Sequence, residues 1–211
     1  GDRLPGEPLT GLVLDLRNNP GGVLNGAVEV TDLFLREGVI VSTRGRTADA
    51  DYTFSATARD VLEGAPMVVL VNRGSASASE IVAGALQDHG RALILGTKTF
   101  GKGSVQTILP MNNGAALKLT TARYYTPNGR SIQATGIEPD IVSRRLQLSD
   151  QPNRSGTREA DLAGHLQNES TDSEDEAGAA VQAERLQDRD FEVGEALNLL
   201  KGMVLARRQA G

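Results

Sequence analysis

Hydrophobic positions change their spacing along the first half of the chain, and these changes predict strands alternating with helices. Continuous apolar runs near 11–17 and 67–72 are typical of strands buried on both faces. Helical spacing follows each of them, predicting one helix near 23–35 and another near 77–88. Two shorter runs predict further strands near 38–43 and 92–96. This alternation favours an α/β core.

The second half has a different pattern. Segments 105–109 and 116–125 resemble an antiparallel strand pair joined by the turn formers of 110–114. Beyond residue 143 the chain becomes polar and acidic, and apolar periodicity returns only in a helix near 188–208. The apolar stripe of that helix is Val193, Ala196, Leu197, Leu200, Met203 and Val204. We expect this stripe either to dock on the core or to contact another subunit.

Composition removes several classes of function. The net charge of −5 provides no basic face for nucleic acid. With no cysteine, the chain has neither disulfides nor thiolate metal sites, which suits an oxidising envelope compartment. Two histidines are too few to suggest a metal centre. We therefore expect no cofactor and no metal.

Candidate chemistry begins at Ser77, which lies where the strand near 67–72 turns into the next helix. Free backbone N–H groups converge at a helix N-terminus, so the N–H of Ala78 could stabilise an oxyanion formed beside Ser77. Serine is also a common N-cap, and Glu80 completes the spacing of a capping box. Taken alone, this helix start predicts only a cap.

Lys102 strengthens the catalytic interpretation because it follows on a nearby turn, between two glycines and before an apolar alternation. A lysine acts as a general base only when it is neutral, which requires burial or a cationic neighbour. The same turn, residues 96–102, also matches the G-x-x-x-x-G-K part of a phosphate-binding loop. Gly103 stands where that loop needs a hydroxyl, and a strand is predicted where it needs a helix. Nucleotide binding is therefore the weaker alternative.

A third segment supplies a second candidate oxyanion donor. Residues 18–22, Asn-Asn-Pro-Gly-Gly, form a tight turn between the first predicted strand and helix. Such a glycine turn brings backbone N–H groups close to a reaction centre, so Gly22 is a candidate donor. The turn could equally be purely structural.

Together these segments resemble the carboxyl-terminal processing peptidases, also called tail-specific serine proteases. The resemblance covers about residues 12–142 and returns near 158–166 and at 196–201, where it is similar to the bacterial envelope branch. The motifs that carry it stand at 15–22, 74–81, 99–103, 126–130 and 136–140.

The resemblance implies a role for each matching residue. Ser77 takes the place of the nucleophile and Lys102 that of the general base. Gln106 matches the residue that helps to position the lysine. Gly22 and Ala78 match the two oxyanion N–H donors. The implied activity is a serine endopeptidase that cleaves proteins in or near their C-terminal regions through an acyl-enzyme.

The family also implies an architecture and a setting. The expected fold is a ClpP/crotonase-like spiral core with an antiparallel strand pair and a C-terminal helical tail. Expected partners are protein or peptide substrates with apolar C-termini, an adaptor protein, and further copies of the chain bound through the C-terminal helix. The expected location is the bacterial periplasm, although this chain carries no targeting segment.

Domain boundaries follow from the same comparison. We expect a linker remnant at 1–10, the peptidase core at 11–145, a polar and partly disordered acidic segment at 146–187, and an amphipathic helix at 188–208. Only a short Pro/Gly-rich stretch precedes the first motif, whereas the family carries an N-terminal helical region and a PDZ domain there. The chain is therefore expected to be a fragment. A catalytically incomplete fragment with an interaction or assembly role remains the alternative function.

Overall fold

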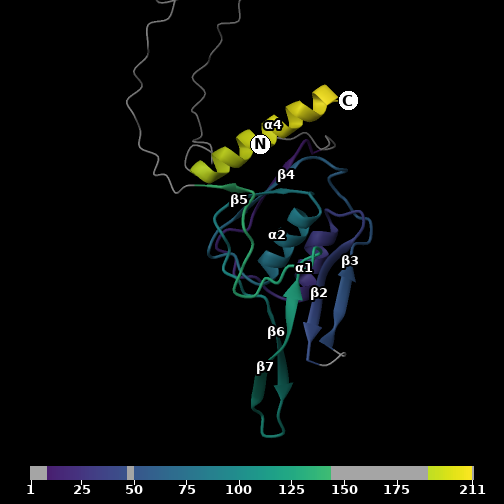
Figure 1. The fold of residues 1–211 in the computed structure, drawn as a ribbon, viewed down its shortest axis with the longest axis vertical. Helices are drawn as coiled ribbons and strands as arrows, with labels where there is room; N and C mark the ends of the chain where they lie inside the picture. The colour runs from purple at the N-terminus through teal and green to yellow at the C-terminus, as the bar shows by residue number, and fades with distance from the viewer. Residues whose placement is uncertain (1–8, 47–49, 144–189, 211) are drawn as a thin grey trace, which may run out of the picture.

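A computed structural model describes residues 9–46, 50–143 and 190–210. The predicted linker remnant lies almost wholly outside these residues, as does the acidic segment. Within them the chain forms a mixed α/β fold, as the alternation of apolar patterns predicts. Figure 1 shows one parallel sheet, one antiparallel sheet and three labelled helices.

The first sheet is parallel, with the strand order β1-β4-β5-β8. Its inner strand β4 is buried at all five residues, because helices cover both faces. The strand bounds are Leu12–Asp15 for β1, Met67–Val71 for β4, Leu93–Gly96 for β5 and Ile141–Val142 for β8.

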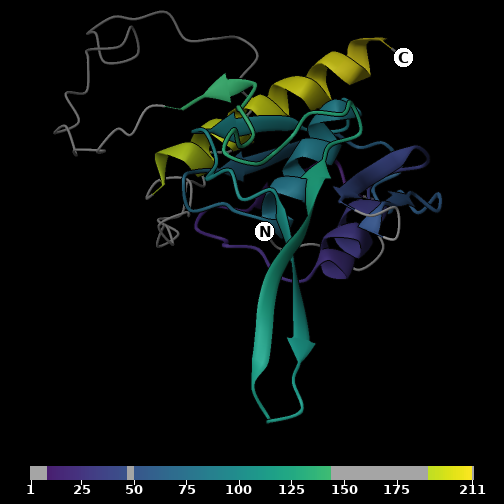
Figure 2. The same cartoon turned by 60° about the horizontal axis from the view of Figure 1, so that its bottom comes forward.

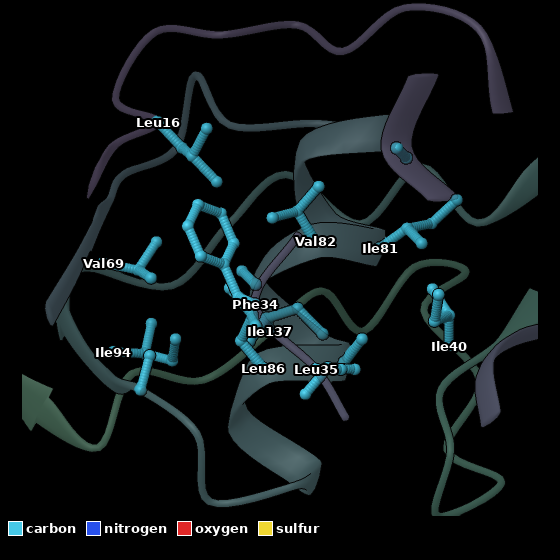
Figure 3. Packing of buried hydrophobic residues seen from close by; sticks show 14 of the residues in the cluster. Leu16, Phe34, Leu35, Ile40, Val69, Ile81, Val82, Leu86, Ile94 and Ile137 are labelled. Atoms are coloured by element: carbon cyan, nitrogen blue, oxygen red, sulfur yellow. The ribbon is translucent and has the colours of Figure 1, made fainter. Parts of the chain in front are cut away.

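Alternate residues of β4 divide the hydrophobic core into two layers. Met67, Val69 and Val71 face the main cluster beneath α1 (Leu24–Asp32) and α2 (Ala78–Asp88), part of which is drawn in Figure 3. Val68 and Leu70 belong to the second cluster, on the other side of the sheet. The parallel sheet is thus packed between α1 and α2 on one face and a different helix on the other.

That helix is α4 (Phe191–Ala210), which lies across the parallel sheet in Figure 1. Docking on the core, one of the two predicted fates, is therefore confirmed. The residues that join the second cluster are Val193, Ala196, Leu199, Leu200 and Met203. Leu199 replaces the predicted Leu197 and Val204 in this contact, because the helix is rotated slightly relative to the predicted stripe. None of the described helices is long and apolar enough to cross a membrane.

The second sheet is antiparallel, with the strand order β3-β2-β7-β6. Its bounds are Tyr52–Ser55 for β3, Val39–Gly45 for β2, Ala116–Tyr125 for β7 and Ser104–Pro110 for β6. The β6–β7 hairpin confirms the predicted strand pair, and both views show it projecting away from the body of the protein (Figures 1 and 2). Its root lies next to the loop that carries Lys102.

Candidate active site

Three loops converge at one edge of the parallel sheet. They follow β1, β4 and β5, which are neighbours in the sheet and point in the same direction. Their carboxyl ends therefore share an edge, the usual position of sites in parallel sheets. Each of the three candidate motifs lies on one of these loops.

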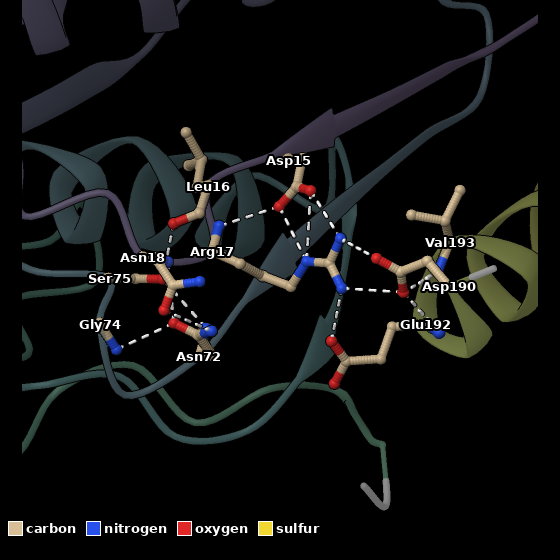
Figure 4. Close-up of polar contacts among 10 residues, drawn as sticks. All are labelled: Asp15, Leu16, Arg17, Asn18, Asn72, Gly74, Ser75, Asp190, Glu192 and Val193. Carbon is tan, nitrogen blue, oxygen red and sulfur yellow. Dashed lines mark hydrogen bonds and ion pairs between the residues drawn. The ribbon is translucent and has the colours of Figure 1, made fainter. Parts of the chain in front are cut away.

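Hydrogen bonds tie the first loop to the second (Figure 4). The Asn18 backbone N–H donates to Asn72 Oδ1 at 2.9 Å, and Asn72 Nδ2 donates to Asn18 Oδ1 at 3.1 Å. The buried Ser75 hydroxyl donates to the Leu16 carbonyl at 2.7 Å. Segments more than 50 residues apart in the sequence are thereby fixed together just before Ser77.

Gly21 brings the predicted oxyanion donors together. It has a φ of +89°, and a Cβ at this position would lie 2.5 Å from the Ala76 carbonyl oxygen and 2.7 Å from the Ala78 nitrogen. Only glycine permits such a close approach. A Cβ on the next residue, Gly22, would meet nothing within 4 Å. The peptide that precedes Gly22 therefore lies against the Ser77–Ala78 peptide, with open space beside it.

Ser77 has an unusual backbone conformation. Its φ of 57° and ψ of −115° lie outside the regions that a non-glycine residue normally adopts. Such a conformation costs on the order of 1 to 3 kcal/mol and persists only where neighbouring contacts impose it. Ser77 directly precedes α2, and among the described residues the Ala78 N–H, the first of that helix, forms no hydrogen bond. A strained serine at a strand-to-helix turn is the geometry of an exposed nucleophile.

The contacts that impose this conformation come from Glu80, which is fully buried. Its Oε2 accepts the backbone N–H of Ser77 and that of Lys102, both at 2.8 Å. Its Oε1 accepts the Thr99 hydroxyl at 2.5 Å and the Gly101 N–H at 2.7 Å. One carboxylate therefore joins the loop that carries Ser77 to the loop that carries Lys102.

Lys102 and Lys98 occupy different environments. Lys102 is half-buried in the loop between β5 and β6. Lys98 is half-exposed, and its Nζ forms an ion pair with Glu138 Oε1 at 2.5 Å. The chain after Lys102 continues into β6 and not into a helix, as predicted, so this loop lacks the helix dipole that a phosphate-binding loop uses.

Gln106 lies on β6, opposite Thr120 of β7, with an exposed side chain. Within the described residues it forms no hydrogen bond to Lys102, and none joins Ser77 Oγ to Lys102 Nζ. The positioning role of Gln106 thus remains a prediction. In the same part of the chain, no group of three or more His, Cys, Asp and Glu side chains is placed to hold a metal ion.

Arg17 connects the edge of the site to α4. Its guanidinium donates to Asp15, Asp190 and Glu192, at 2.7 Å in the shortest contact to each (Figure 4). The hydrogen bonds to Asp15 and then Asp190 raise the Arg17 pKa above its ordinary value. The hydrogen bond from Arg17 lowers the pKa of Asp190, against the opposing effect of burial. Because Asn18 follows Arg17 directly, the start of α4 is fixed to the base of the glycine loop.

Sequence reasoning missed the central role of Glu80. The Ser-x-x-Glu spacing was visible but predicted only a local helix cap, and the bond from the Ser77 N–H to Glu80 is indeed part of one. Thr99 and Gly101 join through tertiary folding, which no local pattern encodes. A buried acidic residue in an otherwise apolar helix face is the signal that could have suggested that Glu80 binds several donors from other loops.

Comparison with known proteins agrees with this geometry. Residues 2–143 match the profile of peptidase family S41. The carboxy-terminal-processing protease of Bartonella bacilliformis is 49% identical over 203 residues, which cover 96% of this chain and 46% of that protein. The carboxyl-terminal-processing protease of Synechocystis is 47% identical over 139 residues, covering 66% of this chain and 32% of that protein.

A solved structure agrees as well. The photosystem II D1 C-terminal processing protease superposes with a TM-score of 0.60 at 42% identity, covering 64% of this chain and 35% of that one. The chain thus spans less than half the length of these relatives. The match to the family profile nonetheless includes all three loops that form the site. The chain belongs to peptidase family S41.

Proposed function

We propose that the protein is a serine endopeptidase with a Ser77/Lys102 dyad, built on a ClpP/crotonase-like spiral core. It cleaves proteins in or near their C-terminal regions. The observation that carries this proposal is the shared acceptor Glu80 Oε2, because it holds the backbones of Ser77 and Lys102 to one atom. The close packing of Gly21 on the Ser77–Ala78 peptide supports the position of the oxyanion donors.

The reaction is acyl transfer in two stages. Neutral Lys102 accepts the Ser77 hydroxyl proton as Oγ attacks the scissile carbonyl carbon, and the Gly22 and Ala78 N–H groups donate to the resulting oxyanion. The C–N bond then breaks, and the proton passes from Lys102 to the leaving amine. Water attacks the acyl-enzyme ester by the same route, which releases the acid and restores Ser77.

Two exposed apolar side chains support substrates with apolar residues near the cleavage point. Val23, directly after Gly22, is 74% exposed, and Phe100, two residues before Lys102, is 68% exposed. The Phe100 N–H donates to the Ser75 carbonyl at 3.0 Å, which keeps it near the nucleophile. Burial of such side chains by a bound peptide is favourable, at about 25 cal/mol per Å² of apolar surface.

The dyad is tested by Ser77→Ala and Lys102→Ala. Each is expected to lower peptide cleavage by at least about a thousandfold, because a nucleophile and its base act as one unit. Lys98→Ala, four residues earlier and half-exposed, is the matched control and retains wild-type turnover. Circular dichroism checks that every variant is folded. Near wild-type cleavage by the Lys102→Ala variant contradicts the dyad.

An assembly role is the second candidate, and one observation favours it. One side of α4 carries a hollow of about 870 Å³ lined by Phe191, Leu199, Gly202 and Met203 among others. A further copy of the chain could pack against this side of the helix. If the wild-type protein cleaves no peptide yet self-associates, the assembly role replaces the catalytic one.

The protease proposal also includes a location in the bacterial periplasm, which the similarity at 196–201 implies.

A further inference from the structure

The antiparallel sheet places two arginines directly opposite each other. Arg44 of β2 pairs with Arg123 of β7, and both side chains are exposed on the face away from the core. Directly opposed side chains in an antiparallel sheet have Cβ atoms about 5 Å apart, and like charges there are destabilising. A negatively charged group bound between the two arginines would relieve this repulsion.

A hollow of about 450 Å³ lies over this pair. Arg46, Thr121 and Tyr125 line it together with the two arginines. The Arg44 guanidinium stacks on the Tyr125 ring, with Cζ 4.6 Å from the ring centroid. Stacking fixes the plane of the guanidinium and leaves its N–H edge free to donate two parallel hydrogen bonds.

Several other arginines of the described chain have acidic partners. Arg17, Arg91 and Arg130 each form an ion pair with an aspartate. Among the same residues, neither Arg44 nor Arg123 forms one. Asp51 is near in sequence, but its Oδ1 accepts the Gly45 backbone N–H at 2.8 Å. Within the described residues, the two arginines of the hollow therefore have no ion-pair partner.

The hollow is close to the proposed catalytic lysine. Arg123 pairs with Ser104, which follows Lys102 by two residues, or at most about 7 Å of extended chain. The N–H of Tyr124, next to Arg123, donates to the Gly103 carbonyl at 2.7 Å. A polypeptide held at Ser77 can therefore reach the hollow with a group only a few residues from its cleavage point.

We propose that Arg44 and Arg123, with Arg46, bind a carboxylate of the substrate polypeptide. This inference rests on the proposed protease function and adds a specificity site to it. A carboxylate fits because the fork of an arginine donates to both of its oxygens. Nucleic acid fits poorly, because the net charge is −5 and the arginines form one small cluster and not a stripe. The carboxylate is either the α-carboxylate of the substrate or an Asp or Glu side chain.

Binding is measured in the full chain carrying Ser77→Ala, so that no peptide is consumed. Three fluorescent octapeptides share one apolar sequence: the free acid, its C-terminal amide, and the amide with one internal Glu. The site predicts that the amide lacking Glu binds about tenfold more weakly than at least one acidic peptide. Stronger binding of the free acid identifies the α-carboxylate, and stronger binding of the Glu peptide identifies the side chain.

Arg44→Gln and Arg123→Gln are expected to weaken binding of the acidic peptide about tenfold and to leave the neutral peptide unchanged. Lys118→Gln is the matched control, because it removes the same charge farther along β7, outside the hollow. Neither arginine variant lowers the melting temperature, since each relieves repulsion. If the protein with both arginines intact binds the acidic and the neutral peptides with equal affinity, the proposal is overturned. Cleavage of the neutral peptide by the protein with Ser77 intact shows separately whether the protease function holds.

Discussion

At the scale of single residues, the site depends on one carboxylate with four donors. Glu80 receives three backbone N–H groups and one hydroxyl, so both of its oxygens act only as acceptors. Its bonds cross from α2 to the loop after β5, the loop that carries Lys102. The positive φ of Ser77 is held by this carboxylate and by the packing of Gly21. In the proposed mechanism Glu80 is a positioning residue, because it acts through the backbones of Ser77 and Lys102.

Glu80→Gln tests this role. The amide of glutamine replaces one acceptor oxygen by a donor, so two of the four donors lose their partner, at about 1 to 3 kcal/mol each. We expect kcat to fall at least about tenfold with a small change in KM, together with a lower melting temperature. Glu138→Gln, which alters an exposed carboxylate paired with Lys98, is the control and changes neither quantity. A Glu80→Gln variant with a lower melting temperature but wild-type kcat would make Glu80 purely structural.

Local sequence predicted the positions of the candidate motifs better than the contacts that connect them. The glycine turn at 18–22 and the serine at a strand-to-helix junction both have local signatures, and both lie where they were expected. Thr99 and Arg123 have no such signature. Thr99 meets Glu80 across 19 residues, and Arg123 meets Arg44 only through strand register. Contacts of this kind depend on the whole sheet and not on periodicity.

At the scale of elements, the start of α4 fixes the base of the first catalytic loop. Asp190 accepts the backbone N–H groups of Glu192 and Val193, as an N-cap does, and its other contacts are to Arg17. Arg17 immediately precedes the loop of Asn18 to Gly22. Undocking of α4 would therefore release one side of the proposed oxyanion hole as well as expose the sheet.

Asp190→Asn separates the ion pair from the cap, because asparagine is an equally good N-cap. The Arg17 hydrogen bond holds the pKa of Asp190 below its ordinary value of 3.8. Its stabilisation is thus complete above that value and is lost as pH falls through the lowered pKa. At 31% exposure the pair contributes about 1 kcal/mol, so the variant melts about 2 to 4 °C lower at pH 7.

Thermal melts from pH 7 to pH 3 check this expectation. The difference between wild type and Asp190→Asn should shrink below about pH 4, where the Asp190 carboxylate of the unfolded chain becomes protonated while the native one is still ionised. Glu37→Gln, at an exposed position with no ion pair among the described residues, serves as the control. A difference that stays constant down to pH 3 would show that the charge of Asp190 contributes nothing.

Periodicity predicted the longer elements and missed the short ones. The strands β1, β2, β4 and β5, the helices α1 and α2, and the β6–β7 hairpin all lie within a few residues of the predicted ranges. The missed strands are β3, which has four residues with alternating polar positions, and β8, which has two. Both strands form by pairing with the edge of a neighbouring strand: β3 pairs with β2, and β8 pairs with β5. Such pairing is a property of the sheet and leaves little trace in so short a sequence.

At the scale of the whole molecule, the catalytic loops and the exposed side of α4 are separate surfaces. The loops lie at the carboxyl edge of the parallel sheet, whereas α4 covers one of its faces (Figure 2). The inner side of α4 contributes Ala196, which is fully buried, to the second cluster. The hollow lined by Phe191 and Gly202 runs along the same helix and shares Leu199 and Met203 with this cluster. A partner bound there would cover apolar surface without blocking Ser77.

Gly202→Glu tests whether that partner is a second copy of the chain. A Cβ at Gly202 would meet nothing within 4 Å, and glutamate favours a helix more than glycine does, so α4 should stay docked. A buried charge at a subunit contact is strongly unfavourable. Light scattering is therefore expected to give a multiple of 22.3 kDa for the wild type and a single chain for the variant. Lys201→Glu, exposed and outside the hollow, should keep the wild-type mass. A wild type of 22.3 kDa, or a variant that still self-associates, would remove the oligomer.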